Sequence, residues 1–203
     1  MAIGIAHIWS GADHVLFLLA LLMTSVLQRT PAGWAARPSL RASIVDVAKI
    51  VTAFTFTHSI TLSLAALGLL RPAPRIIEPA IAASVVVAAV DNLRPFLGGR
   101  KWVVAGTLGL VHGFGFASAL NDLALPKEAL LVTLSGFAMG VETGQLIFVA
   151  AFVPLAFVLR KTVLYQRWFL RGGSLAIAMI AAVWMVERAA PRQREMAAVS
   201  IAP

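Results

Sequence analysis

Several long apolar runs, separated by short segments that hold most of the charge, are the feature that most constrains this chain. Each run is long enough to cross a hydrocarbon layer of roughly 30 Å as a helix and is too long for an ordinary core helix. Only 13% of the 203 residues are charged, about half the share found in soluble domains. Because backbone polar groups in lipid must be satisfied within each segment, the sequence predicts an all-α, polytopic membrane protein.

We predict six transmembrane helices in a single domain that covers residues 1–190. They run over Ile5–Leu27, Val47–Leu70, Ile76–Pro95, Trp102–Leu120, Ala129–Leu159 and Phe169–Val186. The first run lacks the positive n-region and cleavage site of a secretory signal, so we count it as a span. The longest connection, Gln28–Ser43, is expected to be mobile or to lie along the membrane interface. Residues 191–203 are expected to form a disordered tail.

Loop charge predicts the orientation, because Lys and Arg concentrate in cytoplasmic loops. With the N-terminus outside, the inner segments hold eleven of the 17 basic residues: Arg29, Arg37, Arg41, Lys49, Arg94, Arg100, Lys101, Arg160, Lys161, Arg167 and Arg171. Both termini are therefore predicted to lie outside a bacterial inner (cytoplasmic) membrane. The net charge of +8 fits contact with the lipid bilayer rather than with nucleic acid. Three spans per half would make any repeat an inverted 3+3 repeat, and polar residues centred in spans two and five suggest one weakly.

Ionisable residues gather at one depth of the predicted membrane. His58, His112 and Glu142 lie near the middle of their spans, and Asp13 and His14 lie roughly 3–5 Å outward from the middle of the first. A charged group at the centre of a bilayer costs roughly 2.5–3.5 kcal/mol on insertion scales, so each needs a partner or a function. We find no basic residue at the same depth. A bound cation would use the imidazoles and neutralise the carboxylates.

The first span carries the densest pattern, with His7, Asp13 and His14. On a continuous helix the two histidines fall about 20° apart on one face, with His7 two turns above His14 near the outer surface. His7 would then collect an ion at an entry site. Asp13 lies 100° from His14 and would either bind the ion or orient a neighbouring imidazole.

The other spans supply polar stripes and small residues. Thr55, His58 and Thr61 share one face of the second span, although helical threonines commonly bond only their own backbone. Two glycines follow His112 and would let the helix break or another backbone approach. In the fifth span, Gly136, Gly140 and Gly144 form a face for close helix packing, with Glu142 and Gln145 beside it.

Three further polar residues are candidates for a pathway: Thr61, Gln145 and Asp91. Asp91 lies nearer the inner surface. Either it pairs with Arg94, or it stands on an exit path.

The ligand types limit the ion. Imidazole suits Ni²⁺, Co²⁺, Zn²⁺ or Cu²⁺, and the absence of cysteine argues against a thiolate path for Cu(I). Ca²⁺ and Mg²⁺ sites use oxygen ligands and would not recruit histidines. The residue types are therefore compatible with any of Ni²⁺, Co²⁺, Zn²⁺ and Cu²⁺.

Four motifs in order resemble the HupE/UreJ family of hydrogenase and urease accessory membrane proteins. They are AHIWSGADHVLFLLA from Ala6, FTFTHSITL from Phe54, GLVHGFGFA from Gly109 and GVETGQL from Gly140. The family is similar to nickel/cobalt permeases, so the resemblance implies transport of Ni²⁺ or Co²⁺ for metalloenzyme maturation proteins. It points to His7, Asp13, His14, His58, His112 and Glu142 as site residues. The prolines and methionines that many members show around the first motif are absent, which indicates a divergent branch.

The sequence therefore favours a permease for a divalent transition metal, not an enzyme. Its metal is the substrate: nickel or cobalt first, then zinc or copper. No P-loop is present, so energy would come from a gradient, the membrane potential or protons. The alternatives are an intramembrane zinc hydrolase with Glu142 as base, a haem protein with His58 and His112 as axial ligands, and a membrane partner protein that only binds metal.

Overall fold

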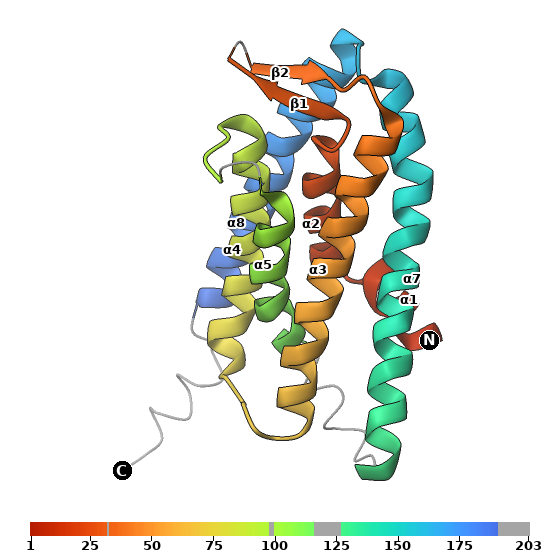
Figure 1. Cartoon of the computed structure of the whole chain (residues 1–203). Coiled ribbons are helices and arrows are strands. Elements are labelled where there is room, and N and C mark those ends of the chain that lie inside the picture. Colours follow the sequence, from red (N-terminus) through yellow and green to blue (C-terminus); the bar gives the residue numbers. More distant parts are fainter. Residues whose placement is uncertain (32, 98–99, 116–126, 191–203) are drawn as a thin grey trace.

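The computed structural model describes residues 1–31, 33–97, 100–115 and 127–190, which form mainly helices (Figure 1). In chain order the elements are α1 (Ala2–Ser10), α2 (Ala12–Met23), β1 (Leu27–Thr30), β2 (Gly33–Ala36), α3 (Leu40–Ala66), α4 (Pro74–Leu93), α5 (Lys101–Gly115), α7 (Lys127–Leu159), η1 (Leu164–Gly172) and α8 (Gly173–Ala189). The π-helix η1 continues directly into α8. The predicted tail, 191–203, lies outside the described residues.

Long apolar helices show that the chain is a multi-pass membrane protein. By length and hydropathy, α3, α4, the part of α7 from Val132 and the continuous helix Leu164–Ala189 are each able to cross a membrane. They correspond to the second, third, fifth and sixth predicted spans. Helix α3 begins earlier than predicted because the Ser39 hydroxyl accepts a hydrogen bond from the Ala42 N–H at 3.3 Å and caps the helix. The fourth span corresponds to α5, and its predicted end lies outside the described residues.

The first predicted span is broken, so the expectation of one straight helix is wrong. Helices α1 and α2 are together apolar enough to cross, but they meet at Gly11 with a bend of 76°. The Gly11 N–H donates to the His7 carbonyl at 3.1 Å and ends α1, while the Gly11 carbonyl accepts from the His14 and Val15 N–H groups and begins α2. As a result α1 lies against α7 part-way along the bundle (Figure 1).

The first connection, Gln28–Ser43, contains part of a hairpin that lies across one end of the bundle, and its predicted position along the membrane interface stays a prediction. Strands β1 and β2 pair antiparallel, with Leu27 opposite Ala36 and Thr30 opposite Gly33. The hydroxyl of Thr30 donates to the Gly33 carbonyl at 2.8 Å, and Gly33 has a φ of 117°, which favours glycine. We call this side of the molecule the hairpin end (Figure 1).

Glycines let two helix pairs approach until their backbones touch. On α5, a Cβ at Gly113 would lie 2.3 Å from the His58 carbonyl oxygen, so α3 and α5 pack only because no side chain is there. A Cβ at Gly140 on α7 would lie 2.1 Å from the Met1 carbonyl oxygen. Gly144 likewise faces Ile5. The predicted packing role of the glycine face on α7 is confirmed, and its partner is α1.

A buried amide joins three helices near the hairpin end. Asn92 on α4 donates to the Ala20 carbonyl on α2 at 2.7 Å and to the Ser174 hydroxyl on α8 at 3.2 Å. Its Oδ1 accepts from Thr24 at 3.2 Å, and its backbone carbonyl accepts from the Trp34 indole at 2.9 Å. In an apolar surrounding each of these bonds satisfies a group that has no water to replace it. This amide therefore fixes α2, α4, α8 and β2 relative to one another.

The count of six spans, the placement of both termini outside and the inverted 3+3 repeat remain predictions. Reporter fusions at either terminus can measure on which side of the membrane that terminus lies.

Asn92→Ala should destabilise the protein, because it removes the donor to the Ala20 carbonyl and to the Ser174 hydroxyl and the acceptor of the Thr24 hydroxyl. We expect a loss of about 1–3 kcal/mol and a lower thermal unfolding midpoint in detergent micelles. Thr143→Ala is the control, since the Thr143 hydroxyl bonds only the Met139 carbonyl of its own helix. Equal midpoints for the two variants would show that Asn92 does not hold the helices together.

Candidate metal centre

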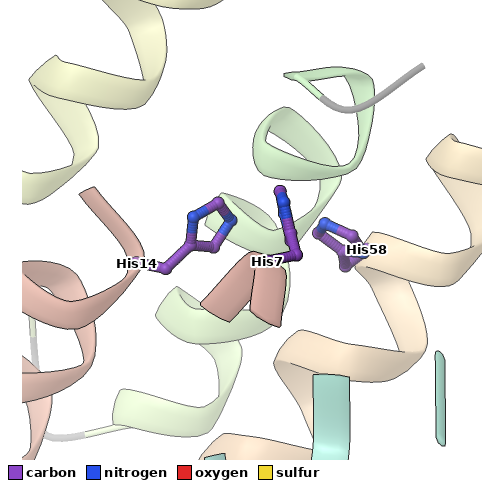
Figure 2. A group of neighbouring side chains, drawn as sticks. All are labelled: His7, His14 and His58. Atoms are coloured by element: carbon purple, nitrogen blue, oxygen red, sulfur yellow. The ribbon is translucent and has the colours of Figure 1, made fainter. Parts of the chain in front are cut away.

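Three imidazoles from three helices converge where the first span is broken. His7 comes from α1, His14 from α2 and His58 from α3, and Figure 2 shows His7 between the other two. One potential ligand nitrogen from each ring lies within 4.8 Å of the others. The ring centroids of His7 and His14 are 4.5 Å apart, and each is 6.3 Å from that of His58. We call these residues the histidine cluster.

The bend at Gly11 is what places His7 beside His14. On a straight helix the two side chains would be separated by two turns, or roughly 10 Å. The expected entry position of His7, two turns above His14, is therefore wrong. A Cβ at Gly11 would lie 2.7 Å from His14 Nδ1 and 2.8 Å from the His7 carbonyl oxygen. The imidazole of His14 thus occupies the space that any other residue at position 11 would need.

His58 is held on the buried face of α3, with an exposed fraction of 1%. The polar stripe predicted around it has two different roles. Thr55 donates to Gln145 Oε1 on α7 at 3.1 Å and so links the two helices one turn from His58. Thr61 bonds only carbonyls of its own helix, at Thr57 and His58. Thr61 therefore makes only the bonds to its own backbone that are common for helical threonines, whereas Thr55 joins two helices.

His112 is a further buried imidazole outside the cluster, and its ring centroid lies 5.1 Å from that of His14. Its Nε2 is 2.8 Å from the Ser84 hydroxyl on α4. With the Ser84 proton directed to the Ile81 carbonyl at 2.6 Å, we assign the Ser84 oxygen as the acceptor from His112 Nε2–H. This assignment leaves the lone pair of His112 on Nδ1, where a metal could be bound.

The carboxylate of Asp13 forms an ion pair with Arg188. Arg188 on α8 donates to both of its carboxylate oxygens, at 2.8 and 3.1 Å, in a bidentate arrangement. The expectation that the carboxylates at this depth have no basic partner is therefore wrong for Asp13. Arg188 is distant in sequence and lies just beyond the predicted end of the sixth span. Its guanidinium removes the charge that Asp13 would have offered to a cation.

Two further predicted residues, Glu142 and Asp91, lie outside the cluster. Glu142 is half-buried on α7, between Gly140 and Gly144, the two glycines that contact α1. Asp91 accepts from the Phe96 and Leu97 N–H groups, each at 2.9 Å, and so caps the turn after α4. These two bonds, rather than the predicted pair with Arg94, therefore engage the carboxylate of Asp91.

His14, His58 and His112 offer ring nitrogens that have no hydrogen-bond partner among the described residues. These atoms are both ring nitrogens of His14, Nε2 of His58 and Nδ1 of His112, and all of them are buried. Unsatisfied polar atoms in an apolar interior are unfavourable, and a cation would satisfy them. Metal–imidazole bonds of about 2.1 Å bring ligand nitrogens to roughly 3–3.4 Å, so the rings would close by about 1–2 Å around an ion. Rotation of the side chains can supply that movement.

Three residues that shape the centre were not found from the sequence. In the sequence, Gly11 is one small residue of the first motif. Ser84 lies inside the predicted third span, and Arg188 lies just after the predicted sixth span. The glycine within the first motif was the one available signal, since a glycine between two helical runs is compatible with a break. The roles of Ser84 and Arg188 depend on contacts across helices, which spacing along one helix does not reveal.

One family model matches the chain. Residues 1–188 match the model described as HupE / UreJ protein. No curated protein and no solved structure matches the chain.

Gly11→Ala should weaken metal binding without unfolding the protein. The new methyl group would displace the His14 ring, and we expect the affinity for Ni²⁺ to fall by about 10–100-fold, as when ligand orientation is lost in other metal sites. Titration calorimetry of the purified protein measures the affinity, and circular dichroism checks the helix content. Gly172→Ala is the matched control, because a Cβ there meets nothing within 4 Å. Unchanged Ni²⁺ affinity in Gly11→Ala would contradict this account of the bend.

Proposed function

The chain belongs to the HupE/UreJ family, and from this premise we propose that it is a membrane transporter for a divalent transition-metal ion, nickel or cobalt, which passes through the histidine cluster. The family implies a role related to nickel or cobalt transport. The single observation that carries the proposal for this chain is the convergence of His7, His14 and His58 at a break between two half-helices. Broken helices at substrate sites are a recurring feature of secondary transporters.

The chemistry of the cluster fits a borderline metal. Imidazole nitrogen binds Ni²⁺, Co²⁺, Zn²⁺ and Cu²⁺ well, whereas Ca²⁺ and Mg²⁺ prefer oxygen. The sequence contains no cysteine, so thiolate cannot compete for the ion. The family favours nickel or cobalt within this group, with zinc and copper as the other candidates.

The charge balance favours passage over permanent binding. Because Arg188 engages Asp13, the cluster itself presents uncharged ligands rather than a carboxylate. A dication there would be held by coordination alone, without a neutralising anion among its ligands. Conduction requires a site strong enough to admit an ion and weak enough to release it. A neutral three-imidazole site meets both conditions better than one with an ionised ligand.

We assign the neighbouring polar residues to the path on either side. His112 stands beside His14 and would take the ion next through Nδ1. Glu142 lies alongside α1 and would attract the cation toward the cluster, while Thr61, Gln145 and Asp91 stay candidates for the pathway. Coupling to the membrane potential would supply about 4.6 kcal/mol per 100 mV for a divalent ion, twice the value for one charge. The destination of the metal in this proposal is a set of metalloenzyme maturation proteins, and the location is the bacterial inner membrane.

His58→Ala should abolish uptake of Ni²⁺ and Co²⁺ into proteoliposomes that contain a metal-quenched dye. Loss of a residue that only supports a metal ligand lowers metal affinity or activity by about 10–100-fold. Removing one of three ligands should lower the uptake rate by more than that. Ser59→Ala is the control, because its hydroxyl bonds only the Thr55 carbonyl of the same helix. Gel filtration should show both variants folded. Wild-type uptake in His58→Ala would refute the proposed route.

A further inference from the structure

A polar cavity lies at the hairpin end, apart from the histidine cluster. It has a volume of about 380 Å³ and is bounded by the hairpin, α3, the end of α4 and the beginning of α5. Five basic side chains line it: Arg29, Arg37, Lys49, Arg100 and Lys101. Nothing in the proposed passage of a metal cation calls for such a concentration of positive charge. Positive charge at a pore mouth would repel a free dication.

The two carboxylates in this cavity do not neutralise it. Asp46 is engaged by Arg37 Nη1 at 2.5 Å. Asp91 accepts its two hydrogen bonds from the backbone N–H groups of Phe96 and Leu97. Five positive and two negative groups leave the lining with an excess of three positive charges. Among the described residues, Arg37 is the only one of the five with a carboxylate partner.

Lys101 is the most informative of these groups. Its Nζ is buried and has no hydrogen-bond acceptor among the described residues. It lies 5.3 Å from the centroid of the Trp34 ring, which the bond to the Asn92 carbonyl holds in place. A cation–π contact compensates only part of the lost hydration of an ammonium group. Burial lowers the pKa of Lys101, which precedes the predicted fourth span, to about 8, although Asp91 opposes the shift.

We propose that this cavity binds the phosphate group of an anionic ligand, with Lys101 and the neighbouring arginines as donors. A phosphate offers three or four acceptor oxygens and up to two negative charges, which matches several N–H donors and an excess of three positive charges. An anion at this position would supply the acceptor that Lys101 lacks. The proposal does not depend on metal transport.

Two sources share this chemistry. The hairpin end belongs to the side on which the basic loops gather, where anionic lipid headgroups collect basic side chains. A phosphodiester headgroup entering from the bilayer and a phosphate ion entering from solution would meet the same donors. The experiment therefore needs one arm for each source.

The test uses the purified chain in detergent and follows its thermal unfolding midpoint. One arm titrates sodium phosphate at ionic strength held constant with sodium chloride. The other titrates phosphatidylglycerol into the micelles, against phosphatidylcholine of the same acyl chains. Lys101→Met removes the buried charge while keeping the length of the side chain. Lys49→Gln is a second variant on the exposed side of the cavity, and Arg75→Gln is the matched control, an exposed arginine at the opposite end of α4.

We expect a saturable rise of the midpoint in one arm, preserved in Arg75→Gln. Saturation by sodium phosphate identifies a phosphate ion, and saturation by phosphatidylglycerol alone identifies a lipid headgroup. In Lys101→Met the concentration for half-saturation should rise about tenfold or more, because a charge-assisted hydrogen bond is lost, and in Lys49→Gln it should rise less. The absence of a saturable effect in both arms would overturn the proposal. So would equal half-saturation in Lys101→Met, Lys49→Gln and Arg75→Gln.

Discussion

The bend between α1 and α2 is the constraint on which the histidine cluster depends. It requires a residue without a side chain at position 11, because the His14 ring and the His7 carbonyl leave no room for a Cβ. It also turns α1 back across the bundle, where Gly4, Gly140 and Gly144 allow contact between backbones. Two histidines that a straight helix would separate by two turns are thereby brought side by side, with their ring centroids 4.5 Å apart. The same kind of contact, through Gly113 on α5, sets the distance between the helices that carry His58 and His112.

Charge placement complements this geometry. In an apolar interior a carboxylate next to three imidazoles would bind a dication strongly, since electrostatic interactions gain strength as water is excluded. The protein instead ties Asp13 to Arg188 and leaves neutral nitrogens facing one another. Ser84 fixes the proton of His112 on Nε2. The proposed passage of a metal ion rests on this neutral set of nitrogens, and the proposed anion site rests on the positive charge of the hairpin end.

The sequence predicts much of this arrangement, and its failures have physical causes. The position of each residue along its span predicts correctly that His14 lies close to both His58 and His112. Hydropathy locates the centre of a span well even where the predicted ends differ from the observed ones. The spacing of His7 and His14 was misleading, because helical periodicity assumes an unbroken helix and Gly11 breaks it. The pairing of Asp13 with Arg188 joins residues at opposite ends of the chain, and no local pattern encodes it. The hairpin was missed because its short strands carry too few apolar residues for an alternating pattern.

The central claim is that imidazoles from separate helices share one ion. The X-ray absorption spectrum of the purified chain, loaded with one equivalent of Ni²⁺, tests it most directly, because imidazole rings scatter in a distinctive way beyond the first ligand shell. The account predicts a stoichiometrically bound ion with nitrogen ligands and the scattering of at least three imidazoles. A shell of oxygen ligands alone, or failure to retain the metal, would contradict it.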